Sequence, residues 1–216
     1  MKITKHGYGI VFSVILITVL AYYFAYANSM TELELPAHIL LILTLFCINF
    51  FRDPDAKDNS NENAILSPAQ GKVVQIKEIE HDDYIGGKAQ QISIFLNVFN
   101  IHVNSHPMAG KIGLFEYRKG KMLAAFNHMA SEENEQTIIG IENEKGRIIH
   151  KQITGLIARR IVCNVEEGQN VAKGERFGMI RFGSRCDVIM PSNVKLNVEV
   201  GQKVERGESV IGEFIG

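Results

Sequence analysis

The sequence predicts a mainly β fold, an antiparallel-rich sandwich or barrel-like domain with hairpin repeats, preceded by an N-terminal transmembrane helical hairpin. Three observations carry this prediction. Residues 8–27 and 37–51 are apolar runs without Asp, Glu, Lys or Arg. From residue 64 onward, short runs rich in Val, Ile and Phe alternate with Gly, Asn and Pro, as is typical of strands and turns. Within this second part, the pattern G-Q-x-V-x-x-G-E occurs twice, beginning at Gly168 and at Gly201.

Composition excludes several classes of function. The 216 residues suffice for one globular domain plus an appendage. A formal net charge of -1 gives no electrostatic basis for binding nucleic acid. The three cysteines, Cys47, Cys163 and Cys186, are odd in number, far apart and without CxxC spacing. We therefore expect neither a disulfide framework nor a metal site, and a reducing compartment for the soluble part.

The first apolar run, residues 8–27, has the length that a helix needs to cross a hydrocarbon core of about 30 Å. A secretory signal peptide is the competing interpretation, because Lys2 and Lys5 precede the run and Ala25-Tyr26-Ala27 resembles a cleavage site. A second apolar run, residues 37–51, argues against it. This run is short for a span, so a tilted or re-entrant placement stays open, as does a single anchor with an interfacial helix.

Charges flanking the two runs predict an orientation. Lysines precede the first run, Arg52 follows the second, and the connecting loop carries only the acids Glu32 and Glu34. The positive-inside rule then places both ends, and the soluble part that follows, on the cytoplasmic side of the membrane. We expect a membrane anchor over residues 1–52, a polar linker over 53–63 and a β domain over 64–216, which would carry the function.

The β domain is predicted from strand-like runs and from the repeat. Residues 72–79, 91–98, 111–117, 147–153 and 160–165 read as strands, and residues 122–131 as one short helix. The two G-Q-x-V-x-x-G-E units lie 33 residues apart and resemble the hairpins of lipoyl- and biotinyl-type sandwich barrels. The Met-Lys-Met signature of a carrier is missing, so this resemblance concerns the fold and not carrier function.

Gly183 and Ser184 lie between the two repeats, flanked by apolar runs at 177–182 and 188–190. A Gly-Ser pair by itself indicates a turn. Glycine also permits φ values closed to other residues and a close approach to its carbonyl. Because Ser184 places a hydroxyl next to that carbonyl, the alternative is a site where the chain attacks itself.

Three further segments, read together, resemble one family. They are F-L-N-V-F-N-I-H-V-N at 95–104, G-L-I-A-R-R-I at 155–161 and R-F-G-S-R at 181–185. In order and at these separations they resemble the short, membrane-anchored bacterial phosphatidylserine decarboxylases, and the resemblance extends over essentially the whole chain.

This resemblance implies a carboxy-lyase that converts phosphatidylserine to phosphatidylethanolamine. It implies self-cleavage between Gly183 and Ser184 into a β chain, residues 1–183, and an α chain, residues 184–216. Ser184 would attack the Gly183 carbonyl and end as an N-terminal pyruvoyl group that forms a Schiff base with the substrate amine and takes the place of pyridoxal phosphate. The implied partners are the phospholipid, the membrane and the two chains as a heterodimer, with dimerisation expected for family reasons alone.

The resemblance also implies site residues. His102 matches the histidine of the family and would act as the base for Ser184 and as a general acid later. Arg159, Arg160 and Arg185 are candidates for the phosphate or carboxylate of the substrate, since guanidinium suits anions; Arg185 is alternatively a candidate to stabilise the oxyanion. His106 is expected to be incidental or supporting.

The chain departs from the family at Gln70. The family motif S-P-A-D-G reads Ser67-Pro68-Ala69-Gln70-Gly71 here, so the aspartate thought to orient the histidine is missing. In serine-protease triads, Asp→Asn costs about 10⁴ in rate. Three hypotheses follow: slow maturation with Gln70 in place, a substitute carboxylate such as Asp187 or Asp82, or an unprocessed protein.

Two other functions remain open from sequence. One is a membrane-anchored sandwich-barrel adaptor or carrier-like protein, which the repeat and the anchor favour. The other is a family member that binds phosphatidylserine without cleaving itself, which Gln70 favours. The intact mass of the protein separates these from the decarboxylase.

Overall fold

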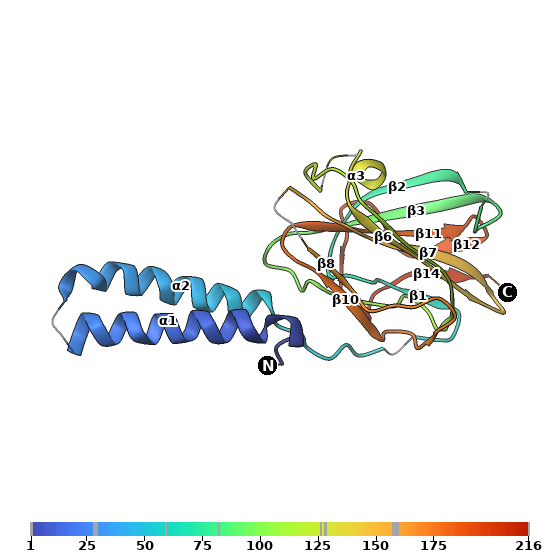
Figure 1. Cartoon of the computed structure of the whole chain (residues 1–216). Coiled ribbons are helices and arrows are strands. Elements are labelled where there is room, and N and C mark those ends of the chain that lie inside the picture. The colour runs from blue at the N-terminus through green and yellow to red at the C-terminus, as the bar shows by residue number, and fades with distance from the viewer. Residues whose placement is uncertain are drawn as a thin grey trace. The chain divides into compact units, whose positions relative to one another are not determined.

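The computed structural model describes residues 2–27, 30–58, 60–81, 83–125, 127, 129–156 and 160–215. The chain forms two compact units, Met1–Asp55 and Ala56–Gly216. In Figure 1 the first unit is the blue helical part, and the second is the β-rich part that runs from green to red.

The first unit is an antiparallel pair of helices, α1 (Tyr8–Ala27) and α2 (Glu34–Phe50), each preceded by a short 3₁₀ turn, η1 (Lys5–Gly7) and η2 (Thr31–Leu33). The helices pack along their length, and the hydroxyls of Thr18 and Thr44 lie 2.8 Å apart between them. Gly7 lies so close to Phe51 that a Cβ on it would come within 2.4 Å of the ring. Small and hydroxyl side chains thus let the two backbones approach, as in membrane helix pairs.

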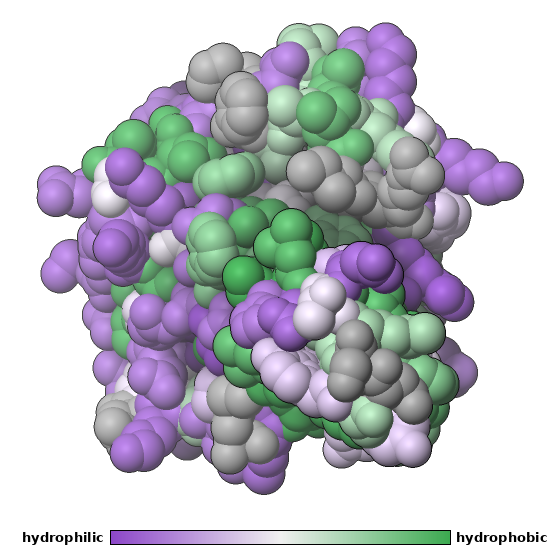
Figure 2. Space-filling view, turned by 90° about the vertical axis from the view of Figure 1, so that its left-hand side faces the viewer, coloured by the Kyte–Doolittle hydropathy of each residue, from purple (hydrophilic) through white to green (hydrophobic). Residues whose placement is uncertain are grey.

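Helix α2 begins earlier than the sequence predicts. The expected run starts at residue 37, whereas α2 starts at Glu34 and includes Pro36 in its first turn, where proline needs no N–H partner. With η2, the helical segment Thr31–Phe50 has 20 residues, so both helices are long and apolar enough to cross a membrane. Their outward side chains are apolar and exposed, for example Phe12 at 69% and Ile42 at 68%. Figure 2, which views the helix pair end-on, colours this hydrophobic surface green.

The described residues of the second unit form three antiparallel sheets. The large sheet has eight strands in the order β13-β2-β3-β11-β7-β6-β5-β9, and two small sheets have the orders β1-β14-β12 and β4-β10-β8. The strands are β1 Ala64–Leu66, β2 Gly71–His81, β3 Gly87–Leu96, β4 Val103–Ser105, β5 Gly110–Arg118, β6 Gln136–Asn143, β7 Gly146–Ile153, β8 Ile161–Cys163, β9 Asn170–Val171, β10 Arg176–Ile180, β11 Ser184–Pro191, β12 Val194–Leu196, β13 Lys203–Val204 and β14 Val210–Phe214. The predicted mainly β, antiparallel fold class is confirmed.

The main core lies between the large sheet and the small ones. Figure 1 shows the long strands β2, β3, β11, β7 and β6 above the short strands β1, β14, β8 and β10. Fully buried apolar side chains of both layers form one cluster; they include Ile65, Ile92, Ile94, Ile139, Ile141, Ile148, Phe177, Val188 and Ile211. Alternate residues of the long strands point into this core, which is why the sequence shows strand-like alternation.

The hairpin repeat predicted from sequence is present in the backbone. Gly168 and Gly201 both have positive φ, 84° and 98°, and so do Gly174 and Gly207, 77° and 68°. The N–H of Gly168 donates to the carbonyl of Ile112 at 2.8 Å, and that of Gly201 donates to the carbonyl of Val73 at 2.8 Å. Each unit needs glycine at its turns because other residues avoid this φ.

The repeat belongs to a duplication of the whole β unit. The strand order of the large sheet is symmetric about its middle: β11 corresponds to β7, β3 to β6, β2 to β5 and β13 to β9. The two small sheets correspond to each other in the same way, β1-β14-β12 to β4-β10-β8. The pairing of β11 with β7, from Arg185–Ile153 to Ile189–Ile149, lies at the centre of this arrangement. In the half made of β4 to β10, β6 and β7 form a tight hairpin. In the other half, β3 and β11 pair in the same way, but the whole of β4 to β10 lies between them in the sequence.

The predicted helix over residues 122–131 is wrong. The described residues of this region are mostly irregular, and the helix α3 spans only Ala130–Glu133. The side chain of Asn134 explains the irregular backbone, because it accepts a hydrogen bond from the N–H of Leu123 and donates one to its carbonyl, both at 2.8 Å. These bonds replace the ones that a helix would supply.

Candidate active site

Ser184 begins β11, in the middle of the large sheet. Its backbone pairs with Leu96 of β3, and its neighbour Arg185 pairs with Ile153 of β7. Ser184 is fully buried, and its Oγ has no hydrogen-bond partner among the described residues. Leaving a buried polar group unsatisfied costs about 1–3 kcal/mol, so such a hydroxyl calls for an explanation such as a catalytic role.

The strained backbone lies at Phe182 and not at Gly183. Phe182 has a φ of 69°, and among the described residues it is the one non-glycine residue with positive φ. This conformation costs about 1–3 kcal/mol for a residue with a side chain, and it sets the direction in which the chain enters β11. Glycine at 183 was expected to supply the unusual φ, yet Gly183 has no positive φ, and the nearest atom to an added Cβ would be the carbonyl oxygen of Leu96 at 3.8 Å.

The close approach to the Gly183 carbonyl comes from Gly155. A Cβ added to Gly155 would lie 2.2 Å from the Gly183 oxygen and 3.0 Å from the Cβ of Ala125. Only glycine fits at this position, because real Cβ atoms do not approach an oxygen so closely. The backbone of residue 155 therefore packs directly against the carbonyl that Ser184 would attack.

His102 lies fully buried on the segment between β3 and β4. Its Nδ1 lies 2.9 Å from the carbonyl oxygen of Asn100, which can only accept, so Nδ1 carries the proton. In the neutral ring, Nε2 then carries the lone pair that a general base requires. The N–H of Ile180 donates to the His102 carbonyl at 3.1 Å and ties this segment to the strand that leads into residue 184.

Gln70 lies beside the same segment. Its Oε1 accepts a hydrogen bond of 2.6 Å from the N–H of Ile101, and its Nε2 donates to the carboxylate of Glu205. A small buried cluster of Ala69, Leu96, Ile180 and Cys186 joins the flanks of Gln70, His102 and Ser184. The structure thus brings together the segments that carry these three residues.

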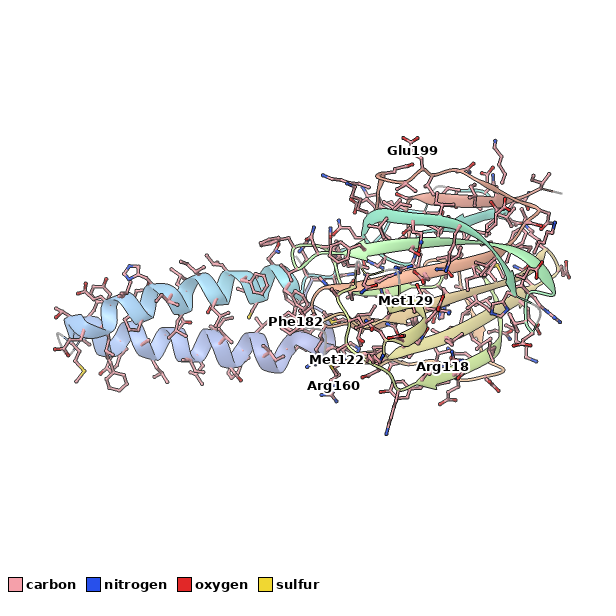
Figure 3. All side chains as sticks on the ribbon, turned by 90° about the horizontal axis from the view of Figure 1, so that it is seen from above. Arg118, Met122, Met129, Arg160, Phe182 and Glu199 are labelled. Atoms are coloured by element: carbon pink, nitrogen blue, oxygen red, sulfur yellow. The ribbon has the colours of Figure 1, made fainter. Side chains whose placement is uncertain are left out.

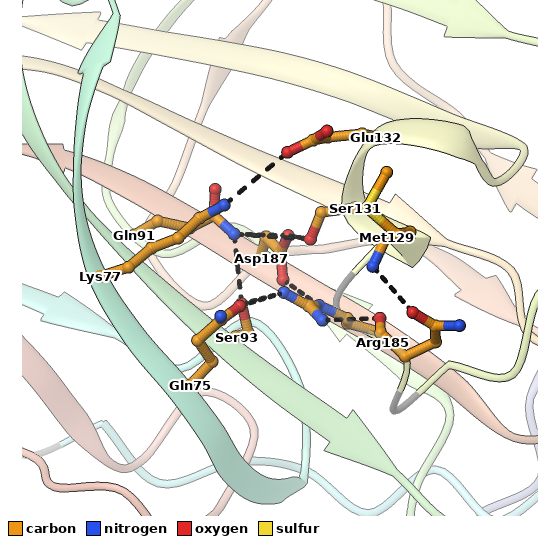
Figure 4. A network of polar contacts seen from close by, with 10 residues as sticks. Gln75, Lys77, Gln91, Ser93, Met129, Ser131, Glu132, Arg185 and Asp187 are labelled. Carbon is orange, nitrogen blue, oxygen red and sulfur yellow. Dashed lines mark hydrogen bonds and ion pairs between the residues drawn. The ribbon is translucent and has the colours of Figure 1, made fainter.

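The guanidinium of Arg185 faces inward. Arg185 is 1% exposed and Asp187 is fully buried, and Arg185 Nε donates to Asp187 Oδ1 at 2.7 Å. Figure 4 shows the surrounding network from β2, β3 and α3, whose partners include Gln75, Gln91, Ser93 and Ser131. This position favours a structural role for Arg185 over contact with a substrate headgroup, and it engages Asp187 away from His102.

Arg160, another predicted anion-binding residue, makes no contact with this network among the described residues. Arg160 is exposed, and its carbonyl accepts a hydrogen bond of 3.1 Å from the N–H of Arg181. Figure 3 shows Arg160, Met122 and Phe182 at one end of the large sheet. Arg159 and Asp82 lie outside the described residues.

Two other groups of titratable residues are not nucleophiles. Burial raises the pKa of Cys163 to about 12 and also raises the pKa of Cys186, so both stay protonated thiols. His106 contacts His150 and stacks on Phe177 in the core, and its ring does not bond Ser184. Burial lowers the pKa of His106 to about 4.

Sequence reasoning missed two residues of the site. Gly155 was visible only as part of a motif, and no local signal showed which carbonyl it would contact. Glu205 was visible only as a member of the second repeat, where the first repeat has Ala172. Taken together, a buried hydroxyl, a tightly packed carbonyl and an imidazole whose proton is on Nδ1 suit an acyl shift within the chain.

A family model and three relatives of this chain, compared by sequence, all name the same family. A family model described as phosphatidylserine decarboxylase matches residues 43–212. The chain is 49% identical over 170 residues to a phosphatidylserine decarboxylase proenzyme of Chlorobium phaeobacteroides (strain BS1), covering 79% of each chain. It is 44% identical over 213 residues to the proenzyme of Syntrophus aciditrophicus (strain SB), covering 98% of this chain and 97% of the other. It is 38% identical over 212 residues to that of Chlorobium limicola, covering 98% and 100%.

Proposed function

The chain belongs to the phosphatidylserine decarboxylase family, and from this premise we propose that it removes CO₂ from phosphatidylserine through a pyruvoyl group made from its own Ser184. The product is phosphatidylethanolamine. Its relatives carry the name proenzyme, which supports a cleaved two-chain form. The membership favours this function over the adaptor or carrier-like hypothesis.

One observation carries the proposal at the level of the site. The Ser184 hydroxyl is buried without a hydrogen-bond partner among the described residues, one residue after a carbonyl that Gly155 packs against. A serine there with only a structural role would be expected to bond a neighbour. The site also fits the pyruvoyl group, because Ser184 pairs with Leu96 of β3 and the next residue, Arg185, pairs with Ile153 of β7. These pairings hold the start of β11 in the sheet whether or not the peptide bond before Ser184 is intact.

The self-cleavage proceeds in balanced steps. Ser184 Oγ loses its proton to His102 Nε2 and attacks the Gly183 carbonyl carbon, and the peptide bond becomes an ester as the nitrogen leaves and takes up a proton. Loss of the Ser184 α-proton then eliminates the Gly183 carboxylate and leaves a dehydroalanine. Addition of one water and loss of ammonia give the α chain its N-terminal pyruvoyl group.

In the decarboxylation, that group supplies an electron sink for the loss of CO₂ from the amino acid headgroup. Residues of the chain supply the rest. His102, held as the Nδ1–H form by Asn100, moves a proton at Nε2 and returns it to the carbon left by CO₂. Arg160 is exposed and suits the phosphate of the lipid, and Arg159 remains a candidate for the same task.

A diacyl lipid substrate explains the helical unit. We assign residues 1–52 to a membrane anchor, 53–63 to a linker and 64–216 to the catalytic domain. Both helices are long and apolar enough to cross a membrane, and the basic residues lie outside their ends. The positive-inside rule supports a hairpin in the inner membrane with its ends, and the catalytic domain, in the cytoplasm.

The intact mass of the purified full-length protein tests the proposal. We expect a fragment of residues 184–216 whose blocked N-terminus carries a carbonyl, and CO₂ release from phosphatidylserine vesicles. Ser184→Ala should give one uncut chain of 24.2 kDa. A wild-type chain that stays uncut on long incubation would show that the protein is not a self-processing decarboxylase.

A further inference from the structure

Three hydrogen bonds connect the carboxylate of Glu205 with the imidazole of His102. Gln70 Nε2 donates to Glu205 Oε2 at 2.5 Å. The N–H of Ile101 donates to Gln70 Oε1 at 2.6 Å. His102 Nδ1 donates to the carbonyl of Asn100 at 2.9 Å. Since the Asn100 carbonyl and the Ile101 N–H belong to one peptide group, the three bonds form a continuous chain through two amides.

Every donor and acceptor in this chain is fixed by chemistry. The Ile101 N–H can only donate, so the Gln70 atom that meets it is the oxygen, and the amide nitrogen must face Glu205. A carbonyl can only accept, so His102 Nδ1 carries its proton. All three hydrogen bonds therefore point toward the carboxylate, and amides aligned in this way polarise one another.

We propose that Glu205 is a positioning residue for His102 and acts through Gln70 in place of the aspartate that the family motif has at position 70. The carboxylate strengthens the outer hydrogen bond, because bonds to an ionised acceptor are about twice as strong as neutral ones. The polarised peptide then holds the imidazole as the Nδ1–H form, with Nε2 available to Ser184. This inference rests on the proposed self-cleavage.

The loop that carries Glu205 is well held. The Glu205 N–H donates to the Ser209 hydroxyl at 2.9 Å, and the Gly207 N–H donates to the carbonyl of Ser67 at 2.8 Å. Arg206 reaches the buried Ser105 hydroxyl at 2.6 Å. The loop therefore fixes the distance between Glu205 and the segment of Gln70.

Comparison of the two repeats shows that the turn does not need the carboxylate of Glu205 in order to form. The corresponding loop of the first repeat has the same glycine geometry but carries Ala172 where the second has Glu205. A turn of this type therefore folds without the acid. Of the other two candidates for a substitute carboxylate, Asp187 bonds Arg185, and Asp82 lies outside the described residues.

Self-cleavage rates of full-length variants test the relay. We expect Glu205→Gln to slow cleavage about tenfold, which corresponds to about 1.4 kcal/mol in the barrier. Glu208→Gln is the matched control, because Glu208 lies on the same loop, is exposed and accepts from the backbone N–H of Lys57. It should cleave at the wild-type rate. Equal rates for the two variants would overturn the proposal.

A double variant separates relay from loop structure. In Gln70→Asp, a carboxylate at position 70 no longer needs an outer partner and is repelled by Glu205. Adding Glu205→Gln to Gln70→Asp should therefore leave the rate unchanged or raise it. A tenfold loss in both backgrounds would mean that Glu205 only supports the loop, and would contradict the relay.

A spectroscopic measurement does not depend on cleavage. In the uncut Ser184→Ala chain, the ¹H resonance of His102 Nδ1–H should move upfield on Glu205→Gln and stay in place on Glu208→Gln. An unchanged resonance would overturn the relay even if cleavage slows. A wild-type chain that never cleaves would instead refute the proposed function, while this resonance would still report on the relay.

Discussion

Gly155 contributes to the site because, without a Cβ, its backbone can pack against the Gly183 carbonyl. Any Cβ there would meet the Gly183 oxygen at 2.2 Å, so Gly155→Ala must displace the scissile carbonyl or its own strand end. Because a displacement of about 1 Å can cost about 10²-fold in rate, we expect self-cleavage to slow by about that factor. Mass spectrometry against time measures it. Gly183→Ala, which meets no atom closer than 3.8 Å, should fold normally; normal cleavage of Gly155→Ala would refute the steric argument.

The buried ion pair of Arg185 and Asp187 makes a second residue-scale prediction. Asp187→Asn leaves a guanidinium that is 1% exposed without its charge partner. In the uncut Ser184→Ala chain, the free energy of unfolding should fall by about 3–5 kcal/mol, measured by urea denaturation.

The matched control for this prediction is a surface pair. Arg118 Nη2 lies 3.0 Å from Glu116 Oε2, and both side chains are nearly half exposed. Arg118→Gln should therefore change the free energy of unfolding by less than about 1 kcal/mol. Equal effects of the two substitutions would contradict the structural role assigned to Arg185.

Residues whose role is indicated by their neighbours in the sequence could be predicted from the sequence alone. Ser184 and His102 could be proposed as site residues because a hydroxyl beside a glycine carbonyl and a histidine in a segment that matches the family each suggest a reaction. Gly155 and Glu205 could not be found, since each acts on a partner far away in sequence. Arg185 was expected to face the substrate, because sequence does not show which face of a central strand carries a buried polar network.

At the scale of elements, a pair of histidines connects β7 with the segments around β4 and β10. His106 Nδ1 lies 3.4 Å from His150 Nε2, and both rings contact Phe177. Burial lowers the pKa of His106 to about 4, against an opposing effect of Glu175. Burial, with the adjacent His106, also lowers the pKa of His150. The core is therefore built around two uncharged imidazoles.

This packing predicts a loss of stability in acid. An unfolded histidine has a pKa of about 6.5, so below that pH the unfolded chain binds more protons than the folded one. The stability is fully present above pH 6.5, and the free energy of unfolding should fall by up to about 1.4 kcal/mol per pH unit for each histidine as pH drops toward 4. Urea denaturation of the Ser184→Ala chain measures the slope. His150→Gln should reduce it, and an unreduced slope would rule out this pair as its source.

Elements with a local signal were predicted and elements set by tertiary contacts were not. Alternating Val and Ile predicted the long strands, and paired glycines predicted the two repeat turns. The expected helix over residues 122–131 failed because Asn134, from outside the window, bonds its backbone. The start of α2 was misplaced because Pro36 was taken as a boundary, although a first turn accepts it.

At the scale of the whole molecule, the duplication explains where the proposed cleavage falls. The 143–146 turn joins β6 and β7 directly in one half. At the corresponding place in the other half, the chain leaves after β3 and returns only at β11. Ser184 is the first residue of β11. Cleavage before it would therefore cut the long connection between β3 and β11 and leave every strand intact. The ladders of β11 with β3 and β7 do not depend on that peptide bond.

This topology predicts a tight but concentration-dependent complex of the two chains. The proposed α chain, residues 184–216, would contribute β11 to the middle of the large sheet, β13 to its edge on β2, and β14 between β1 and β12. Both chains should therefore elute together in gel filtration under native conditions. Chains below about 40 residues rarely fold alone, so the 33-residue α chain should unfold as it dissociates.

Cleavage makes folding bimolecular, and mass action then links stability to concentration. The thermal midpoint of the cut protein should rise as its concentration is raised, whereas that of uncut Ser184→Ala should not. Differential scanning calorimetry over a wide concentration range measures both. If the midpoint of the cut protein does not depend on concentration, the α chain stays bound to the β chain through unfolding. Pairing of β11 with β3 and β7 would then not be what holds the two chains together.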